Sequence, residues 1–162
     1  MYRICRTFWV ETGHFLSSKK NTSNCRMPHG HSRKIEIILA SNELDENNMV
    51  CDFQILKTGF GKFLDSFDHA MLISSESKHY DYFSKNFDRV ITFEKQDPTS
   101  EAIAEKIFKH ISAELAKNKY YTNKDGSSYK ISDKVYLERV RVWETTNCWA
   151  EYSIPEVSKS QV

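Results

Sequence analysis

The sequence predicts a single α+β domain in which an antiparallel sheet is covered by two helices. Apolar and polar residues alternate near both ends of the chain, which is typical of strands, whereas apolar residues recur every three or four positions in two central stretches, which is typical of helices. The 162 residues are 40% hydrophobic and 28% charged, which suits one globular core. We expect residues 1–154 to form this domain and residues 155–162 to form a flexible tail.

The first two strands are expected to pair with each other. Residues 3–12 are rich in β-branched and aromatic side chains, and Val10 and Thr12 share a side with His14 in an extended backbone. Residues 31–40 alternate in their first half and then become apolar. This region therefore predicts the first antiparallel pair of the sheet.

Two amphipathic helices follow these strands. Asp52 suits the N-cap of the first helix, which extends to Phe67, and Thr99 suits the cap of the second helix, which extends to about Lys117. The apolar residues of the two expected buried faces are Phe53, Leu56, Phe60, Phe63, Leu64 and Phe67, and Ile103, Ile107, Ile111 and Leu115.

The remaining segments predict short strands and loops. Residues 89–93 suggest a short strand, and residues 135–144 and 148–154 suggest the last two strands of the sheet. Residues 74–87 are less regular, and the polar residues 118–134 suggest an exposed loop. The side chains expected on one side of the strand at 135–144 are Tyr136, Glu138, Val140, Val142 and Glu144.

Charge and composition exclude several classes of function. A formal net charge of +1, without a basic face or tail, argues against an electrostatic nucleic-acid or membrane partner. The N-terminus has no apolar signal region, and no stretch approaches the roughly 18 apolar residues of a membrane span. Four cysteines without a CxxC pair suggest reduced thiols in a cytoplasmic protein. They are Cys5, Cys25, Cys51 and Cys148.

The segment from Cys25 to His31 carries the strongest chemical pattern. His29 and His31 point to the same side of an extended backbone and can converge on one ion, and Gly30 between them leaves room. His14 can supply a third imidazole from a neighbouring strand. Three neutral imidazoles without a fourth protein ligand are typical of catalytic zinc, which can lower the pKa of a bound hydroxyl. The alternative is that these are ordinary hydrogen-bonded or surface histidines.

Three further groups have both a structural and a chemical interpretation. Cys25 is either a small buried residue or, near a cation, a thiolate base able to take a proton from carbon. Asp68 and His69 form either a polar helix end or an acid–base pair in which the carboxylate orients the imidazole. Glu144 ends a strand, where glutamates are usually solvated.

These motifs resemble those of the 6-pyruvoyltetrahydropterin synthase and 6-carboxytetrahydropterin synthase superfamily. The resemblance covers most of the chain in six ordered patches, which together make it specific. They are Gly13-His14, Cys25 to His31, Cys51-Asp52-Phe53, Phe67-Asp68-His69, Pro98-Thr99-Ser100-Glu101 and Val142-Trp143-Glu144-Thr145. One departure is Arg33, which stands where an aromatic residue commonly follows the His-x-His segment.

The resemblance implies a tunnelling fold, with an antiparallel four-stranded sheet and two helices on one face. In this superfamily three subunits close into a barrel and two rings stack, which implies a homohexamer with active sites at subunit interfaces. Asp68 and His69 would then come from a neighbouring subunit and face Cys25.

The implied activity is that of a zinc-dependent lyase acting on 7,8-dihydroneopterin triphosphate. The product would be 6-carboxy-5,6,7,8-tetrahydropterin, formed with acetaldehyde and triphosphate on the route to queuosine and related deazapurines. The three-residue gap between Cys25 and His29 resembles the bacterial carboxy-forming enzymes. The alternatives are the pyruvoyl-forming reaction of biopterin synthesis and a non-catalytic pterin-binding or structural protein stabilised by zinc.

The resemblance also assigns roles to individual residues. Cys25 would move a carbon-bound proton, and His69 with Asp68 would return or remove protons. Glu144 would accept two parallel hydrogen bonds from the pterin amino group and ring N–H, with Thr145 as an auxiliary contact. Glu101 is a second auxiliary contact, and the cations that flank the metal motif, Lys19, Lys20 and Arg33, are the candidates for the triphosphate.

Overall fold

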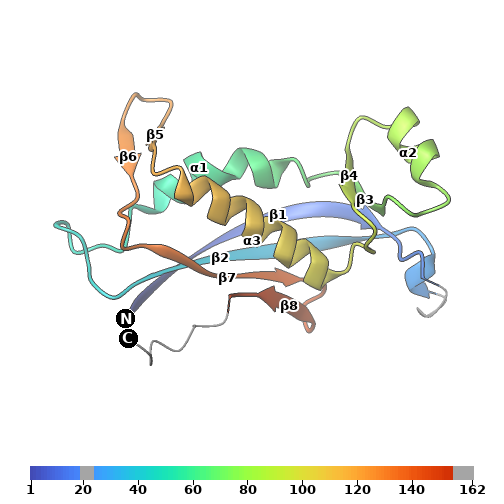
Figure 1. The fold of residues 1–162 in the computed structure, drawn as a ribbon, viewed down its shortest axis with the longest axis horizontal. Helices are drawn as coiled ribbons and strands as arrows, with labels where there is room; N and C mark the ends of the chain where they lie inside the picture. Colours follow the sequence, from blue (N-terminus) through green and yellow to red (C-terminus); the bar gives the residue numbers. More distant parts are fainter. Residues whose placement is uncertain (19–23, 155–162) are drawn as a thin grey trace.

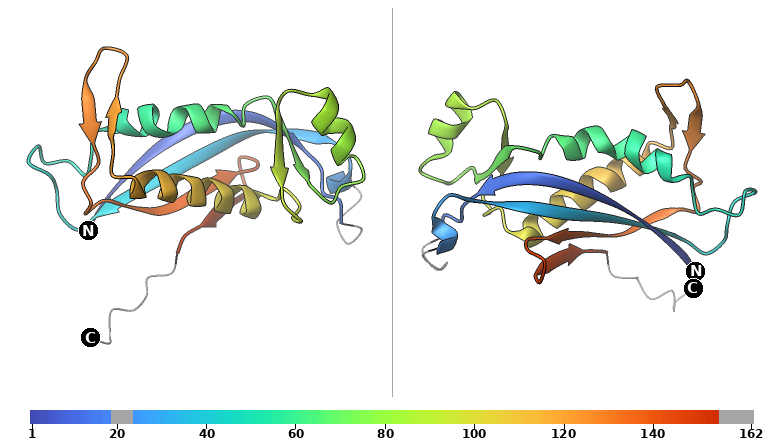
Figure 2. Two further views of the ribbon diagram at one scale, coloured as in Figure 1. Left: turned by 45° about the horizontal axis from the view of Figure 1, so that its top comes forward. Right: turned by 180° about the vertical axis from the view of Figure 1, so that it is seen from behind.

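The computed structural model describes residues 1–18 and 24–154 and shows a curled sheet with two long helices on one face (Figures 1 and 2). The elements are β1 (Tyr2–His14), a 3-10 turn (Asn24–Arg26), β2 (His29–Ser41), α1 (Phe53–Asp65), β3 (Ala70–Ser74), α2 (Tyr80–Asn86), β4 (Val90–Phe93), α3 (Ser100–Ala116), β5 (Tyr120–Thr122), β6 (Ser128–Lys130), β7 (Tyr136–Trp143) and β8 (Trp149–Tyr152). The α+β class predicted from the sequence is therefore confirmed. Residues 155–162, expected to be a tail, lie outside the described residues.

The four antiparallel strands that the sequence predicts form one contiguous part of a larger sheet. The strand order is β4-β3-β1-β2-β7-β8, and β1, β2, β7 and β8 pair antiparallel in that order. Two further strands extend the sheet by parallel pairing, with Thr12 opposite Ala70 and Met71 opposite Val90. The sheet thus has six strands rather than four, because β3, the run after His69, pairs with β1, and β4, the short strand expected at residues 89–93, pairs with β3.

Two segments expected to be irregular contain short elements. Residues 74–87 include α2, whose seven residues present no buried face, so that no helical period marks them in the sequence. Residues 118–134 include the hairpin β5–β6, in which Tyr121 is buried against α1. These elements lie at opposite ends of the molecule (Figure 1).

The alternation predicted for β7 is broken by a β-bulge. Ile38 pairs with Arg139, but the next residue, Leu39, pairs with Leu137, so that Glu138 has no partner in the register. The bulge shifts the strand by one residue, and Leu137 is buried on the same face as Val140. The expectation that Tyr136 and Glu138 share a side with Val140 is therefore wrong.

Both predicted helix caps are present. The Asp52 carboxylate accepts from the backbone N–H of Gln54 at 2.7 Å, and the Thr99 hydroxyl accepts from that of Ala102. Most apolar residues of the two helices pack on the sheet, although Phe53 at the start of α1 is 50% exposed. The central core consists of Ile35, Ile37, Leu39, Leu56, Phe60, Leu64, Ile103, Ile107, Ile111, Val140 and Val142.

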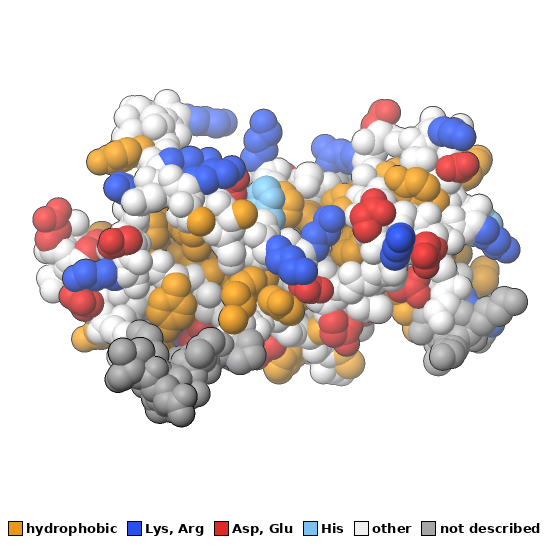
Figure 3. Space-filling view, in the orientation of Figure 1, with side chains coloured by type: hydrophobic (Ala, Val, Ile, Leu, Met, Phe, Trp, Pro, Cys, Tyr) orange, Lys and Arg blue, Asp and Glu red, His pale blue; other side chains and the backbone are white. Residues whose placement is uncertain are grey.

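The surface carries acidic and basic side chains in an interspersed pattern over the face seen in Figure 3. Such a mixture fits the small net charge of +1. Among the described residues, no helix has the length and apolar character that crossing a bilayer requires.

The four cysteines differ in accessibility, which gives a first prediction. Burial, with the carboxylates of Asp52 and Asp45, raises the pKa of Cys51 to about 12, whereas Cys148 is exposed. Because the thiolate is the reactive form, we expect Cys51 to resist a thiol reagent at pH 8 while Cys148 reacts at once. Mass spectrometry after timed labelling, with and without urea, measures this difference. Equal labelling of the two thiols in the native protein would contradict it.

Candidate metal centre and active site

Three histidine rings meet at one end of the β1–β2 pair. His14 lies opposite His29 in the register, and His31 lies two residues further along β2, opposite Thr12. The ring centroids are 4.5 Å apart for His14 and His29, 5.1 Å for His14 and His31, and 4.9 Å for His29 and His31. The alternation that predicted a shared side for these rings thus brings them together.

Backbone carbonyls fix the tautomers of two of these rings. His14 Nδ1 lies 2.8 Å from the Pro98 carbonyl, and His29 Nδ1 lies 2.7 Å from the Met27 carbonyl. Because a carbonyl only accepts, both Nδ1 atoms carry the proton and donate. The two Nε2 atoms then direct lone pairs toward each other at 3.1 Å, an arrangement that a cation between them relieves.

Burial keeps two of the rings neutral. It lowers the pKa of His14 to about 4, although the hydrogen bond to the Pro98 carbonyl acts to raise this pKa. The positive charge of Arg33 lowers it further. Burial and Arg33 likewise lower the pKa of His31. The buried Nε2 of His31 makes no hydrogen bond within the described residues. The neutral imidazole is the form of histidine that binds metal ions.

Glu144 completes this group of donors. Its Oε1 lies 3.1 Å from His31 Nε2 and 3.7 Å from His14 Nε2, and one donor atom from each of the four residues lies within 4.8 Å of the others. Burial raises the pKa of Glu144, but a hydrogen bond from Ser100 and the charge of Arg33 outweigh this effect, so that the pKa is lowered. Three imidazole nitrogens with a carboxylate beside them fit a divalent ion.

Arg33 lies beneath the histidines instead of facing solvent. Its side chain is 0% exposed, and it donates to Thr12 Oγ1 at 2.9 Å, to Ser100 Oγ at 2.8 Å and to His14 Nε2 at 3.3 Å. The sequence-based assignment of Arg33 as a cation for the triphosphate is therefore wrong, because the guanidinium is inaccessible. The other candidates, Lys19 and Lys20, lie outside the described residues.

Two hollows adjoin the histidines and share Gly30, His31 and Ser32. One has a volume of about 870 Å³, and its lining includes His69, Met71, Phe83, Phe87 and Arg89. The other has a volume of about 650 Å³, and its lining includes Trp9, Lys34, Trp143, Glu144 and Thr145. His31 therefore lines both hollows: the one that contains His69, the predicted acid–base residue, and the one that contains Glu144, the predicted pterin anchor.

Asp68 and His69 form the expected pair. Asp68 Oδ2 accepts from His69 Nδ1 at 2.8 Å, and Asp68 Oδ1 accepts from the Glu11 N–H at 2.8 Å. These two bonds lower the pKa of Asp68, the bond from Glu11 more strongly. His69 adopts a left-handed φ of 55° and leaves 74% of its side chain exposed, so that its Nε2 is open to solvent.

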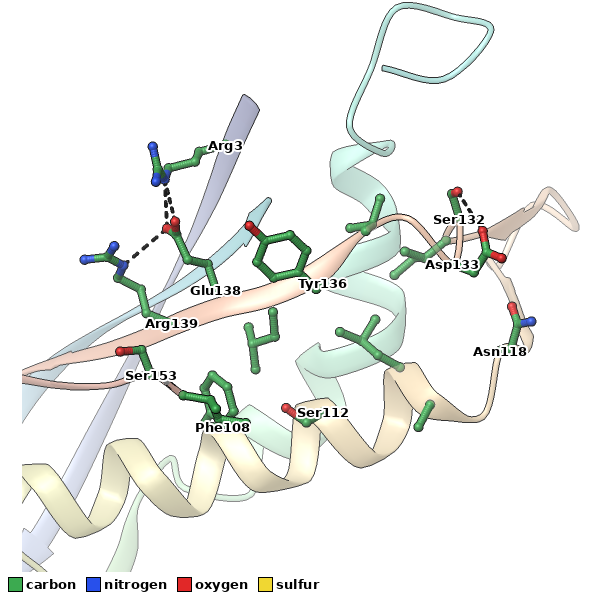
Figure 4. Close-up of a pocket in the computed structure, with 16 residues that line it drawn as sticks. Arg3, Phe108, Ser112, Asn118, Ser132, Asp133, Tyr136, Glu138, Arg139 and Ser153 are labelled. Carbon is green, nitrogen blue, oxygen red and sulfur yellow. Dashed lines mark hydrogen bonds and ion pairs between the residues drawn. The ribbon is translucent and has the colours of Figure 1, made fainter. Parts of the chain in front are cut away.

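A hollow of about 950 Å³, larger than either hollow beside the histidines, lies elsewhere (Figure 4). It is bounded by α3 and the first half of β7, and Glu138 there binds Arg3 and Arg139. Because none of the predicted catalytic, metal or substrate residues lines it, the smaller hollows beside the histidines are the better candidates for chemistry.

Comparison with known proteins agrees with this geometry. The sequence model of 6-pyruvoyl tetrahydropterin synthase matches residues 3–155. The chain belongs to the 6-pyruvoyl tetrahydropterin synthase family. Two relatives are named 6-carboxy-5,6,7,8-tetrahydropterin synthase: a Rickettsia typhi protein, 27% identical over 93% of this chain and 99% of its own length, and a Helicobacter pylori protein, 28% identical over 93% and 69%.

Solved structures show the same fold. An uncharacterized protein from Wolinella succinogenes aligns with a TM-score of 0.73 at 20% identity, over 94% of this chain and 97% of that one. The 6-pyruvoyl tetrahydropterin synthase of Caenorhabditis elegans aligns with a TM-score of 0.59 at 20% identity, over 94% of each chain.

The remaining family motifs occupy distinct places around the site. Cys25 is half-buried in the 3-10 turn, and its carbonyl accepts from the Leu16 N–H at 2.8 Å, although its sulfur is not among the converging donors. Thr145 lines the hollow of Glu144, while its hydroxyl accepts from the Cys148 N–H in the turn between β7 and β8. Glu101 is exposed on the first turn of α3 and lines neither hollow.

Sequence reasoning missed Ser100 and Thr12, which join the site to Arg33. Ser100 belongs to the family motif that begins at Pro98, and its hydroxyl donates to Glu144 while accepting from Arg33. The available signal was helical spacing, because Ser100 precedes Ile103 by three residues and so shares its buried face.

Proposed function

We propose that this chain is a zinc-dependent lyase that converts 7,8-dihydroneopterin triphosphate to 6-carboxy-5,6,7,8-tetrahydropterin, releasing acetaldehyde and triphosphate. The observation that carries the proposal is the convergence of His14, His29 and His31 beside Glu144 in a chain of the pterin synthase family. The relatives named as carboxy-forming enzymes support this product. The reaction would take place in the cytoplasm on the route to queuosine.

The histidines would hold the ion through their Nε2 atoms, because His14 and His29 carry their protons on Nδ1. A bound zinc ion supplies Lewis acidity that polarises substrate oxygens and lowers the pKa of a hydroxyl. The tautomers are fixed before binding, so that no proton has to leave Nε2 of these two rings.

Glu144 would anchor the pterin from the hollow that it shares with Trp143 and Thr145. Its depressed pKa keeps the carboxylate ionised at neutral pH, and an ionised carboxylate can accept two parallel hydrogen bonds from an amino group and a ring N–H. Thr145 and Glu101 remain proposals for auxiliary contacts.

Proton transfer would fall to Cys25, His69 and Asp68. Asp68 holds the proton of His69 on Nδ1, which leaves Nε2 as the atom that takes or returns a proton. Cys25 would remove the carbon-bound proton as a thiolate. In a homohexamer, which we propose from the family, His69 would serve the site of a neighbouring subunit.

The test is incubation of the purified, zinc-loaded protein with 7,8-dihydroneopterin triphosphate, followed by mass spectrometry of the pterins and detection of acetaldehyde. A carboxytetrahydropterin supports the proposal. The second candidate is the pyruvoyl-forming reaction, which the name of the matching family favours. It gives a product of different mass without acetaldehyde, and that result would replace the first proposal.

Removal of the metal separates a catalytic role from a structural one. We expect dialysis against a chelator to abolish turnover while circular dichroism and the oligomer size stay unchanged, because the site lies at one end of a sheet whose apolar core is formed without it. Turnover should return on addition of zinc. Unfolding on chelation would instead indicate a non-catalytic, zinc-stabilised protein.

A further inference from the structure

Arg33 places a full positive charge directly under the metal centre. It is 0% exposed, and its guanidinium remains protonated in proteins and can only donate hydrogen bonds. Its bonds reach Thr12 Oγ1, Ser100 Oγ and His14 Nε2. A buried cation of this kind needs a negative partner, and the nearest is the carboxylate of Glu144, with Oε2 at 3.6 Å from Nη1.

The two oxygens of Glu144 have different environments. Oε2 accepts a hydrogen bond from Ser100 and lies beside Arg33, whereas Oε1 lies 3.1 Å from His31 Nε2 and 3.7 Å from His14 Nε2. Oε1 is therefore near enough to the histidines to become a fourth metal ligand. A fourth protein ligand would close the position that catalytic zinc sites keep open.

We propose that Arg33, acting with Ser100, is a positioning residue that holds Glu144 back from the metal, so that the ion keeps an open position and the carboxylate stays free for substrate. Arg33 neutralises the carboxylate and lowers its attraction to a dication. The claim about metal coordination is independent of the substrate, while the claim about substrate anchoring rests on the proposed function.

A double-mutant cycle tests the metal part without any pterin. The affinity for Co²⁺ is measured by competition with a chelator for the wild-type chain, Arg33→Met, Glu144→Gln and the double variant. We expect Arg33→Met to bind Co²⁺ at least about tenfold more tightly, the size of effect that outer-shell partners have on metal sites. Glu144→Gln should weaken binding by a much larger factor in the Arg33→Met background than in the wild type.

The effect of Glu144→Gln in the two backgrounds distinguishes direct coordination of the ion by Glu144 from a purely electrostatic effect of its charge. If Glu144 acted on the ion only through its charge, it would weaken binding by the same factor in both backgrounds, and equal factors would overturn the proposal. So would unchanged or weaker binding by Arg33→Met.

The visible spectrum of bound Co²⁺ gives a second measurement. Azide should shift the spectrum of the wild-type protein, which has an open position, and leave that of Arg33→Met unchanged. A wild-type spectrum that azide does not alter would also overturn the proposal.

Ser100→Ala keeps the test decisive if Arg33→Met does not fold. This variant frees Oε2 of Glu144 and leaves Arg33 in place, so that we expect tighter Co²⁺ binding and a weaker azide response, both smaller than for Arg33→Met. Wild-type values would contradict the holding role. Because no pterin is present in these titrations, their failure is distinct from a failure of the proposed reaction, which the product analysis measures separately.

Discussion

Replacement of His14 by alanine is expected to abolish turnover and to lower the affinity for zinc or Co²⁺ by more than the roughly 10–100-fold that loss of an outer-shell partner costs. The substitution removes one of three converging nitrogens. It also leaves the Pro98 carbonyl without its donor, and Arg33 Nη2 without its acceptor, next to the ion. Competition with a chelator gives the affinity, and metal analysis after dialysis gives the stoichiometry.

His79→Ala is the matched control, because His79 is exposed at the N-cap of α2 and contacts the ring of Phe15 instead of the cluster. We expect it to retain metal and turnover. Near-ultraviolet circular dichroism of His14→Ala shows whether the fold survives. If a folded His14→Ala bound one equivalent of metal with wild-type affinity, the three-histidine centre would be refuted.

The histidine cluster could be predicted because β1 and β2 keep a strict period of two. In an antiparallel pair the register places His14 opposite His29, and alternation places His31 on the same face. The same parity also predicts that Arg33 faces inward, followed by the buried Ile35 and Ile37. The error at Arg33 came from assuming that a charged residue faces solvent, although the alternation of β2 places Arg33 on the buried side of the strand.

Other features depend on partners that the sequence does not identify. β3 has five residues, of which the first four are apolar, and such a run carries no period that indicates which strand it will join. Its parallel pairing with the end of β1 brings His69 next to Glu11 and into the hollow beside His31. The bulge at Glu138 is similar, because a register shift depends on the partner strand.

Replacement of Cys25 by alanine is expected to lower kcat by about 10²–10⁴-fold, the contribution typical of a general base, while metal affinity stays at the wild-type value. The two effects separate because the Cys25 sulfur is not among the donors that converge at the metal centre. The turn should persist, since the bond that joins Cys25 to Leu16 uses its carbonyl. Steady-state kinetics and Co²⁺ titration of the same preparation measure both quantities.

Exchange of the carbon-bound proton with deuterated solvent isolates the step assigned to Cys25. Cys25→Ala should abolish this exchange, whereas Cys148→Ala, which removes an exposed thiol in the turn between β7 and β8, should leave it unchanged. Cys25→Ser offers a hydroxyl that is a far weaker acid than the thiol, and we expect it to behave like Cys25→Ala at neutral pH. Full turnover by Cys25→Ala would exclude the thiol as the base and leave His69, held by Asp68, as the proton acceptor.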